Sequence, residues 1–259
     1  MLSDQERTFY EELRGIVAKL RAADGCPWDR EQTHASLRPY VIEEAYEVVG
    51  VLDSGDYRRL PEELGDVLFQ VLLHTQLAEE TGDFDMATVL GGLSAKLVSR
   101  HPHVFGDVKL ETSSEVIDQW DRLKKAERAL DDSALANVPA AMPALAYAQT
   151  LLRRAEVAGF AWPNREDVLE KLREELGELA AAPTPEAAAD ELGDILLNVA
   201  NYARYLGIDA EEALRNAGHK FRRRFTAVEA GAREQGIEMK DETREQLMER
   251  WDAAKLSEG

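Results

Sequence analysis

Two pairs of acidic residues in the first half of the chain have a spacing that can bind a metal ion. Glu44 and Glu47 are three residues apart, and so are Glu63 and Asp66. Residues three apart lie on one face of an α-helix, with Cβ atoms about 5–6 Å apart. The segment between the pairs contains glycine and proline, so it can turn the chain and set two helices antiparallel. Four carboxylates facing one another repel, and a hard cation such as Mg²⁺, which prefers oxygen ligands, removes that repulsion.

The same pattern occurs again in the second half of the chain. Its four acids follow their counterparts in the same order and at nearly constant offsets: Glu175, Glu178, Glu191 and Asp194. One such pair alone is typical of a solvated helix face in a chain with 50 acidic residues. An ordered, duplicated quartet instead indicates a repeated module that binds metal. The gap between the two pairs is shorter in the second half than in the first, so the two sites need not be equal.

Iron is a less suitable metal for this pattern. A ferritin-like di-iron bundle would use the same seam between helices, but it requires Glu-x-x-His ligands from two of them. The Glu-x-x-His of this chain runs from Glu31 to His34, outside both acidic motifs. The sequence therefore favours a hard divalent cation.

Helical periodicity runs through nearly the whole chain and supplies the elements that must position these acids. Stretches of alternating, strand-like hydrophobicity are almost absent, so we expect an all-α fold. The pattern predicts helices over residues 4–23, 33–53, 58–80, 86–100, 114–129, 143–157, 164–182, 186–206, 210–234 and 241–256. They form two tandem modules, residues 1–130 and 140–259, joined by an aperiodic linker over 131–139. We expect each module to complete an acidic site of the four-helix-bundle type through dimerisation.

The composition excludes several classes of protein. The chain has 31 Lys and Arg against 50 Asp and Glu, a net charge of −19, so we expect no direct nucleic-acid binding. No apolar run approaches the roughly 18 residues that span a bilayer, and the first residues lack the basic-then-apolar order of a secretory signal. Cys26 is the single cysteine, so no intrachain disulfide can form. These features predict a cytoplasmic protein without membrane contact.

In this order, the motifs resemble those of the MazG family. Gly-Cys-Pro-Trp-Asp (residues 25–29) precedes the first acids, and Lys-x-x-x-Arg-His-Pro-His-Val-Phe-Gly (residues 96–106) follows them. The resemblance covers nearly the whole chain in that family's tandem arrangement. It implies an all-α homodimer that uses Mg²⁺, for which Mn²⁺ can substitute, to cleave nucleoside triphosphates to monophosphate and pyrophosphate. The metal ligands that it implies are Glu44, Glu47, Glu63 and Asp66, and Glu175, Glu178, Glu191 and Asp194.

Cationic residues after each quartet are candidates for binding the phosphates, because a triphosphate cannot lie on carboxylates without them. They are Lys96 and Arg100 in the first half, and Lys220, Arg222, Arg223 and Arg224 in the second. The larger second set predicts that the second half carries most of the activity. An alternative is that these cations pair with some of the chain's many acids.

Two tryptophans are candidates for stacking on the base. Trp120 precedes Lys124 by four residues, and Trp251 precedes Lys255 by the same number. The lysine could reach a phosphate while the ring stacks, and stacking tolerates any base, which suits broad selectivity. Packing within the helical domain is the alternative role for both rings.

The sequence therefore predicts a nucleoside triphosphate pyrophosphohydrolase with broad base selectivity, suited to house-cleaning or to control of the nucleotide pool. Water activated by Mg²⁺ attacks the α-phosphorus, and Glu43 or Glu174 accepts its proton. We expect a homodimer, because a helical hairpin with a polar seam leaves apolar surface for a partner to cover. The competing interpretation is a non-catalytic nucleotide- or metal-binding regulatory module, in which the duplicate serves dimerisation only.

Overall fold

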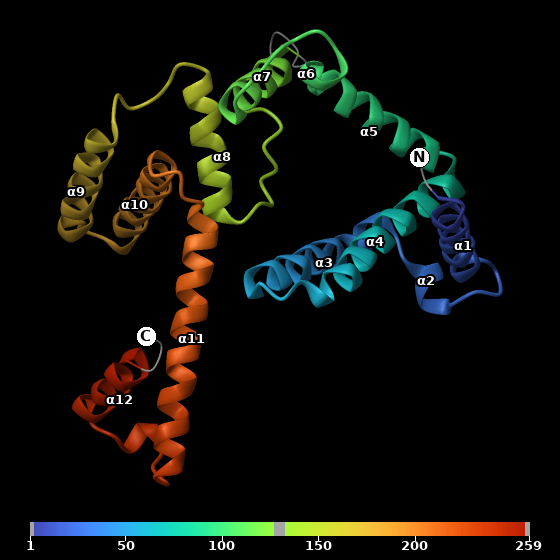
Figure 1. The fold of residues 1–259 in the computed structure, drawn as a ribbon. Coiled ribbons are helices and arrows are strands. Elements are labelled where there is room, and N and C mark those ends of the chain that lie inside the picture. The colour runs from blue at the N-terminus through green and yellow to red at the C-terminus, as the bar shows by residue number, and fades with distance from the viewer. Residues whose placement is uncertain (1–2, 127–132, 257–259) are drawn as a thin grey trace. The chain divides into compact units, whose positions relative to one another are not determined.

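The computed structural model describes residues 3–126 and 133–256, leaving out some side chains between residues 114 and 126 (Figure 1). Every element in these ranges is a helix, which confirms the all-α prediction. No helix in the described part of the chain is long and apolar enough to cross a membrane. The chain divides into two compact units, Met1–Trp120 and Asp121–Gly259.

The first unit is built around a hairpin of two long helices, α3 and α4, which lie side by side in Figure 1. Helices α1 and α5 pack against α4. Residues of α1, α3, α4 and α5 form one buried apolar cluster: Val17, Leu37, Leu72, Leu73, Leu77 and Met86. The elements of the first unit are α1 (Asp4–Arg21), α2 (Pro27–Glu31), α3 (His34–Ser54), η1 (Tyr57–Arg59), α4 (Leu60–Thr81), α5 (Met86–Arg100) and α6 (Pro102–Phe105), and the unit ends within α7 (Ser113–Ala126).

Local sequence fixes the ends of this first hairpin. Thr33 caps α3 by accepting a hydrogen bond from the backbone N–H of Ser36, whose side chain accepts one in return from Thr33. Gly55 ends α3 with φ of 70°, a conformation in which a Cβ is unfavourable. The chain then turns through η1, and Pro61 stands in the first turn of α4. The hairpin therefore has a defined turn, which sets the register of its two helices.

The second unit repeats the hairpin with a shorter turn. Asn164 and Thr184 cap its two helices, and the connection between them consists of residues 182–184. Helix α10 packs against α9 and α8, and the long α11 packs against α8, α10 and α12. The elements are α8 (Ala144–Val157), α9 (Arg165–Ala181), α10 (Pro185–Tyr205), α11 (Ala210–Glu234), η2 (Met239–Asp241) and α12 (Arg244–Leu256).

All ten predicted helices are present, and their described ends lie within about three residues of the prediction. The short helices α2 and α6 were not predicted, because five and four residues are too few to show a helical period. Residues 133–139 of the expected linker contain no helix, and residues 131–132 lie outside the described ranges. The module boundaries at residues 130 and 140 stay a prediction.

The buried cluster gives a test of the first unit's core. Leu73 is fully buried, so Leu73→Ala should lower the free energy of unfolding by about 2–5 kcal/mol through lost burial and a residual cavity. Leu90→Ala, at a side chain that is 51% exposed, should cost about 0.5 kcal/mol or less. Urea unfolding followed by circular dichroism measures both. Equal effects would show that Leu73 does not lie in the core.

Candidate metal centres

The four acids of the first module meet across the seam of the α3–α4 hairpin. Glu47 and Glu63 share a hydrogen bond, and the negative charge of Asp66 acts on Glu44. Each pair therefore joins one residue of α3 to one residue of α4, as the antiparallel hairpin predicted from the sequence requires. Glu63 is almost completely buried, while Glu44 and Asp66 are half-buried.

These acids are in an environment that disfavours their charge. Burial raises the pKa of Glu63, and the hydrogen bond with Glu47 raises it further, while Arg59 acts in the opposite direction. Burial, followed by the charges of Asp66 and Glu47, raises the pKa of Glu44. A cation at the seam would reverse this balance, because it favours the ionised carboxylates.

Gln70, one helical turn after Asp66, extends the seam with a buried amide. It hydrogen-bonds to Glu44 and thereby partly offsets the rise in the pKa of that acid. Its Oε1 atom is buried without a hydrogen-bond partner. Such an acceptor costs free energy, and a hydrated cation held by the acids would bring water donors to it. The orphaned oxygen thus fits a hydrated cation in this seam.

A pocket of about 340 Å³ opens beside the acids, at the turn end of the hairpin. Its acidic walls are Glu47 and Glu63, and η1 contributes Arg59. The Nη2 atom of Arg59 donates a hydrogen bond of 2.6 Å to Oε1 of Glu63. The remaining lining residues are Gly50, Val51, Ser54 and Asp56.

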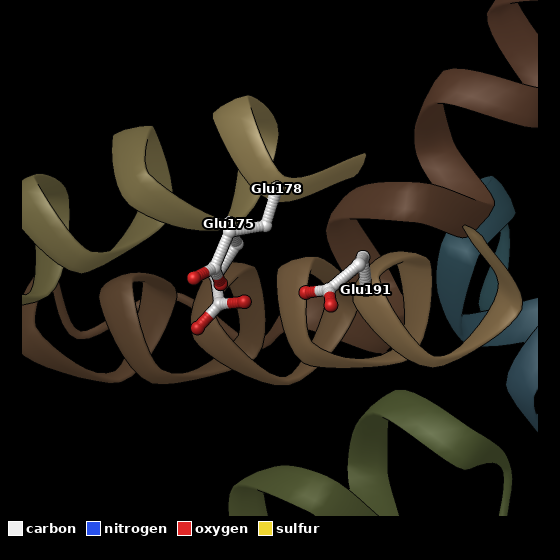
Figure 2. A group of neighbouring side chains, drawn as sticks. All are labelled: Glu175, Glu178 and Glu191. Atoms are coloured by element: carbon white, nitrogen blue, oxygen red, sulfur yellow. The ribbon is translucent and has the colours of Figure 1, made fainter. Parts of the chain in front are cut away.

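The second module brings three of its acids even closer together. Glu175 and Glu178 on α9 and Glu191 on α10 direct their carboxylates into the space between the helices (Figure 2). One oxygen of each lies within 4.8 Å of the others. Mg²⁺ binds oxygen at about 2.0–2.1 Å, so opposite ligands of one ion are about 4 Å apart. A small inward movement would let one ion contact all three. Asp194, one turn after Glu191, is exposed and lies outside this group.

A lysine neutralises part of the second cluster. The Nζ atom of Lys171 lies 2.9 Å from Oε1 of Glu175 and 3.0 Å from Oε1 of Glu174. The hydrogen bond from Lys171 lowers the pKa of Glu175, whose side chain is almost fully buried. Burial raises the pKa of Glu191, and the charges of Glu178, Glu175 and Asp194 add to the rise. Lys171 therefore compensates the charge of Glu175, whereas burial and the neighbouring acids still oppose ionisation of Glu191.

Sequence reasoning missed the two internal cations. Arg59 stands four residues before Glu63, and Lys171 stands four residues before Glu175. A cation four residues from a motif acid on a helix is a readable signal for an ion pair. The two modules neutralise different acids, since Glu63 belongs to the second acidic pair of its module and Glu175 to the first.

The candidate proton acceptors lie at the edge of the clusters. Glu43 and Glu174 are both exposed, and the charge of Glu43 acts on its neighbour Glu44. Glu174 accepts a hydrogen bond from Lys171. Their catalytic role stays a prediction.

The candidate phosphate-binding cations lie on the helix that follows each hairpin. Lys96 and Arg100 are on α5, which packs against α4, and the second set is on α11, which packs against α10. In each module the cationic helix thus contacts the helix that carries the second acidic pair. Lys96 and the second set's Lys220, Arg222 and Arg223 are exposed, whereas Arg100 and Arg224 are half-buried. Phosphate binding by these residues stays a prediction.

Both candidate tryptophans are half-buried and contact another ring. Trp120 makes an edge contact with His101 at a ring-centre distance of 5.1 Å, and Trp251 makes a tilted contact with Phe221 at 5.4 Å. Lys255 donates a hydrogen bond of 2.7 Å to Asp252. The side chain of Lys124 lies outside the described residues. These contacts fit the packing role that the sequence left open, and base stacking stays a prediction.

A known family model matches the chain in two segments, and relatives match nearly its full length. The family model described as the MazG nucleotide pyrophosphohydrolase domain matches residues 32–105 and 164–228. The chain is 41% identical over 247 residues to the nucleoside triphosphate pyrophosphohydrolase/pyrophosphatase MazG of Thermotoga maritima, covering 95% of each chain. It is 41% identical over 256 residues to the nucleoside triphosphate pyrophosphohydrolase of Escherichia coli K12, covering 96% of this chain and 97% of the relative. Both matched segments contain a complete acidic quartet, and the chain therefore belongs to the MazG nucleotide pyrophosphohydrolase family.

Proposed function

We propose that this protein hydrolyses nucleoside triphosphates to nucleoside monophosphates and pyrophosphate with the help of Mg²⁺. The observation that carries the proposal is the convergence of Glu175, Glu178 and Glu191 on one point between two helices. The names of the relatives from Thermotoga maritima and Escherichia coli support the reaction. The all-oxygen character of the cluster supports Mg²⁺, with Mn²⁺ as a substitute, because carboxylates suit both ions.

Residues of the second module would bind the metal ion and accept the proton of the attacking water. When bound, Mg²⁺ would neutralise acids and phosphate oxygens and activate a water molecule for attack on phosphorus. Glu175, Glu178 and Glu191 would hold the ion, and Asp194 would complete the set from the next turn of α10. Glu174 would accept the proton of the attacking water, while Lys171 holds that carboxylate in place through its 3.0 Å hydrogen bond.

Other residues of the second module would bind the substrate. Phosphate oxygens would be held by Lys220, Arg223 and Arg224 on α11, which would also stabilise the charge that develops during attack. Trp251 and Lys255 on α12 would contact the base and a phosphate, and α12 packs directly on α11. Recognition of a base by one ring gives the broad selectivity that house-cleaning of the nucleotide pool requires. In the first module the corresponding residues are Glu43, Lys96, Arg100, Trp120 and Lys124.

We further propose that the second module carries most of the activity. Four cations lie within five residues of α11, against two on α5, and the three converging acids belong to the second module. Each module already pairs one buried acid with a cation, Arg59 with Glu63 and Lys171 with Glu175, so these contacts do not distinguish the two sites.

Dimerisation is supported by an apolar stripe that is repeated in both modules. Helix α4 exposes Leu64, Leu68 and Val71, and α10 exposes their counterparts in the duplicated sequence, Leu192, Leu196 and Val199. Each of these side chains is 40–52% exposed. Contiguous apolar surface of this kind marks an interaction site. Because the stripe runs along the helices that carry the acids, we propose that a second copy of the chain covers it.

The catalytic proposal is tested by pyrophosphate release from mixed nucleoside triphosphates. We expect release in Mg²⁺ and none in excess chelator. Asp194→Asn should lower the rate at least about tenfold, equivalent to about 1.4 kcal/mol of barrier, and Asp66→Asn clearly less. Equal losses would mean two working sites, and the reverse order would refute the assignment to the second module. Full turnover in chelator would refute the role of the metal.

The metal centre also predicts how the melting temperature responds when one acidic charge is removed. The pKa of Glu191 is raised, so its stabilising contribution is present in acid and is lost as the pH rises through that pKa. In chelator at neutral pH, Glu191→Gln should therefore raise the melting temperature. Mg²⁺ should raise that of the unaltered chain more than that of the variant, because the ion binds the native state. Glu170→Gln, an exposed acid on α9, is the charge control. A lower melting temperature for Glu191→Gln alone in chelator would contradict this account.

The apolar stripe is tested by Leu196→Asp, which places a charge at its centre in the second module. We expect sedimentation velocity to show a dimer for the unaltered chain and a shift toward monomer for the variant, since a buried unpaired charge is costly. Leu256→Asp, at the exposed end of α12, should leave the dimer intact. An unaltered chain that sediments as a monomer would refute the proposal. Circular dichroism establishes that each variant is folded.

A further inference from the structure

Two histidines connect α3 and α4 at the end of the hairpin that lies away from its turn. His34 is the first residue of α3, and His74 lies in the second half of α4. Their Nδ1 atoms are 2.7 Å apart. Glu44 follows His34 by ten residues, which is about 15 Å along a helix. The histidine pair is therefore separate from the acidic centre of the same hairpin.

The two imidazole rings present their Nδ1 atoms to each other. The ring centres are 5.0 Å apart and the ring planes differ by 10°. The ring-centre distance exceeds the Nδ1–Nδ1 distance by about the width of one ring, so both nitrogens lie between the rings. Only one proton fits between them, with one ring as donor and the other as acceptor. The pair therefore offers two nitrogen atoms that converge on one point.

The surroundings of His74 favour the neutral ring that metal binding requires. Burial lowers the pKa of His74, and the neighbouring His34 lowers it further. A neutral imidazole is the form that binds a metal ion.

The second module has a corresponding contact between the two helices of its hairpin, but the residues that make it have no imidazole nitrogens. Arg165 corresponds to His34 and Tyr202 to His74, at the same offsets that relate the acids of the two modules. Tyr202 acts electrostatically on Arg165, so these two positions lie close together in both modules. Neither a guanidinium nor a phenol is the nitrogen ligand that a transition metal prefers. The duplication thus provides a comparison within one chain, in which one copy of the contact has converging imidazoles.

We propose that His34 and His74 form a second kind of metal site, which binds Zn²⁺ or a similar transition ion through both Nδ1 atoms. Zinc binds imidazole nitrogen at about 2.0–2.1 Å, so the two Nδ1 atoms would move apart to about 3.3 Å to admit a tetrahedral ion. The proton now shared by the two Nδ1 atoms would move to Nε2 of the donor ring, and water would complete the coordination. Imidazole selects zinc, copper and nickel, whereas the carboxylate clusters suit magnesium and manganese.

Zinc at this point would join the two helices that carry the first module's acids. A ligand that binds only the native hairpin stabilises it against unfolding. The site would therefore stiffen the hairpin of the first module. This inference does not depend on the proposed reaction, since it rests on the histidine pair alone.

The test is Zn²⁺ titration of the metal-stripped full chain in excess Mg²⁺, which keeps the carboxylate clusters occupied. We expect calorimetry to show a Zn²⁺ site and thermal unfolding to show a higher melting temperature with Zn²⁺. The decisive variant carries His34→Arg and His74→Tyr, which installs the pair that the second module already uses. Its Zn²⁺ affinity should fall at least about tenfold, because even partners outside the ligand shell contribute that much. Its pyrophosphate release in Mg²⁺ should be unchanged.

A matched control removes the chain's other pair of neighbouring histidines. His101 and His103 have ring centres 5.6 Å apart, but Nδ1 of His101 already lies 2.6 Å from the carbonyl oxygen of Leu97. The variant His101→Ala with His103→Ala should keep the Zn²⁺ site and its effect on the melting temperature. If the first double variant fails to fold, the single change His34→Ala at an exposed position replaces it. Unchanged Zn²⁺ affinity after loss of His34, or loss of the site in the control alone, would overturn the proposal.

Discussion

The repulsion between carboxylates across a helical hairpin is the constraint on which the rest of this structure depends. Glu63 and Glu175 are 1% and 3% exposed, so each carries the desolvation cost of a charge removed from water. Arg59 and Lys171 each offset one of these charges. The raised pKa values of Glu44 and Glu191 show that the remaining acids are still unbalanced. A divalent cation, as proposed above, would supply the missing positive charge and would tie the folding of the hairpin to the chemistry of its seam.

Both copies of the duplicated module have carboxylates between two helices, but different cations neutralise them. In the first module an arginine from the turn reaches the acid on the second helix, and this turn is long enough to include η1. In the second module the turn is shorter, and a lysine within the first helix reaches the acid one turn later. The difference in turn length, visible as the shorter gap between the acidic pairs of the second module, thus has a structural consequence. The shorter turn of the second module, residues 182–184, has no segment like η1 from which an arginine could reach the seam, and a lysine on the first helix pairs with the acid instead. The ammonium group of lysine is a compact point charge, whereas the guanidinium group of arginine is planar.

Periodicity alone was enough to predict the long helices, and the structure adds that Thr33, Asn164 and Thr184 each accept a backbone hydrogen bond where a helix begins. The spacing of the acids also predicted that carboxylates of two helices face one another across the first seam. Which of them pair, and which other side chains touch between helices, could not be predicted, because a repeat period does not give the distance between side chains on different elements. The unpartnered oxygen of Gln70 and the convergence of His34 with His74 are of this kind. Both appear only when α3 and α4 are placed side by side.

Acids in the seam of a hairpin also limit what the hairpin can bury by itself. Helix α3 buries only Leu37 and Val51, and in α9 the buried residues are Val168 and the acid Glu175. Half of the buried apolar residues described in the first unit belong to α4, which packs against α1 and α5 as well as α3: Leu72, Leu73, Leu77 and Ala78. Seam positions hold glutamate here, while apolar side chains such as Leu64 and Leu192 are exposed on the same helices. Because the acidic seam and the apolar stripe share these helices, a substitution in one can alter the stability of the helix that presents the other.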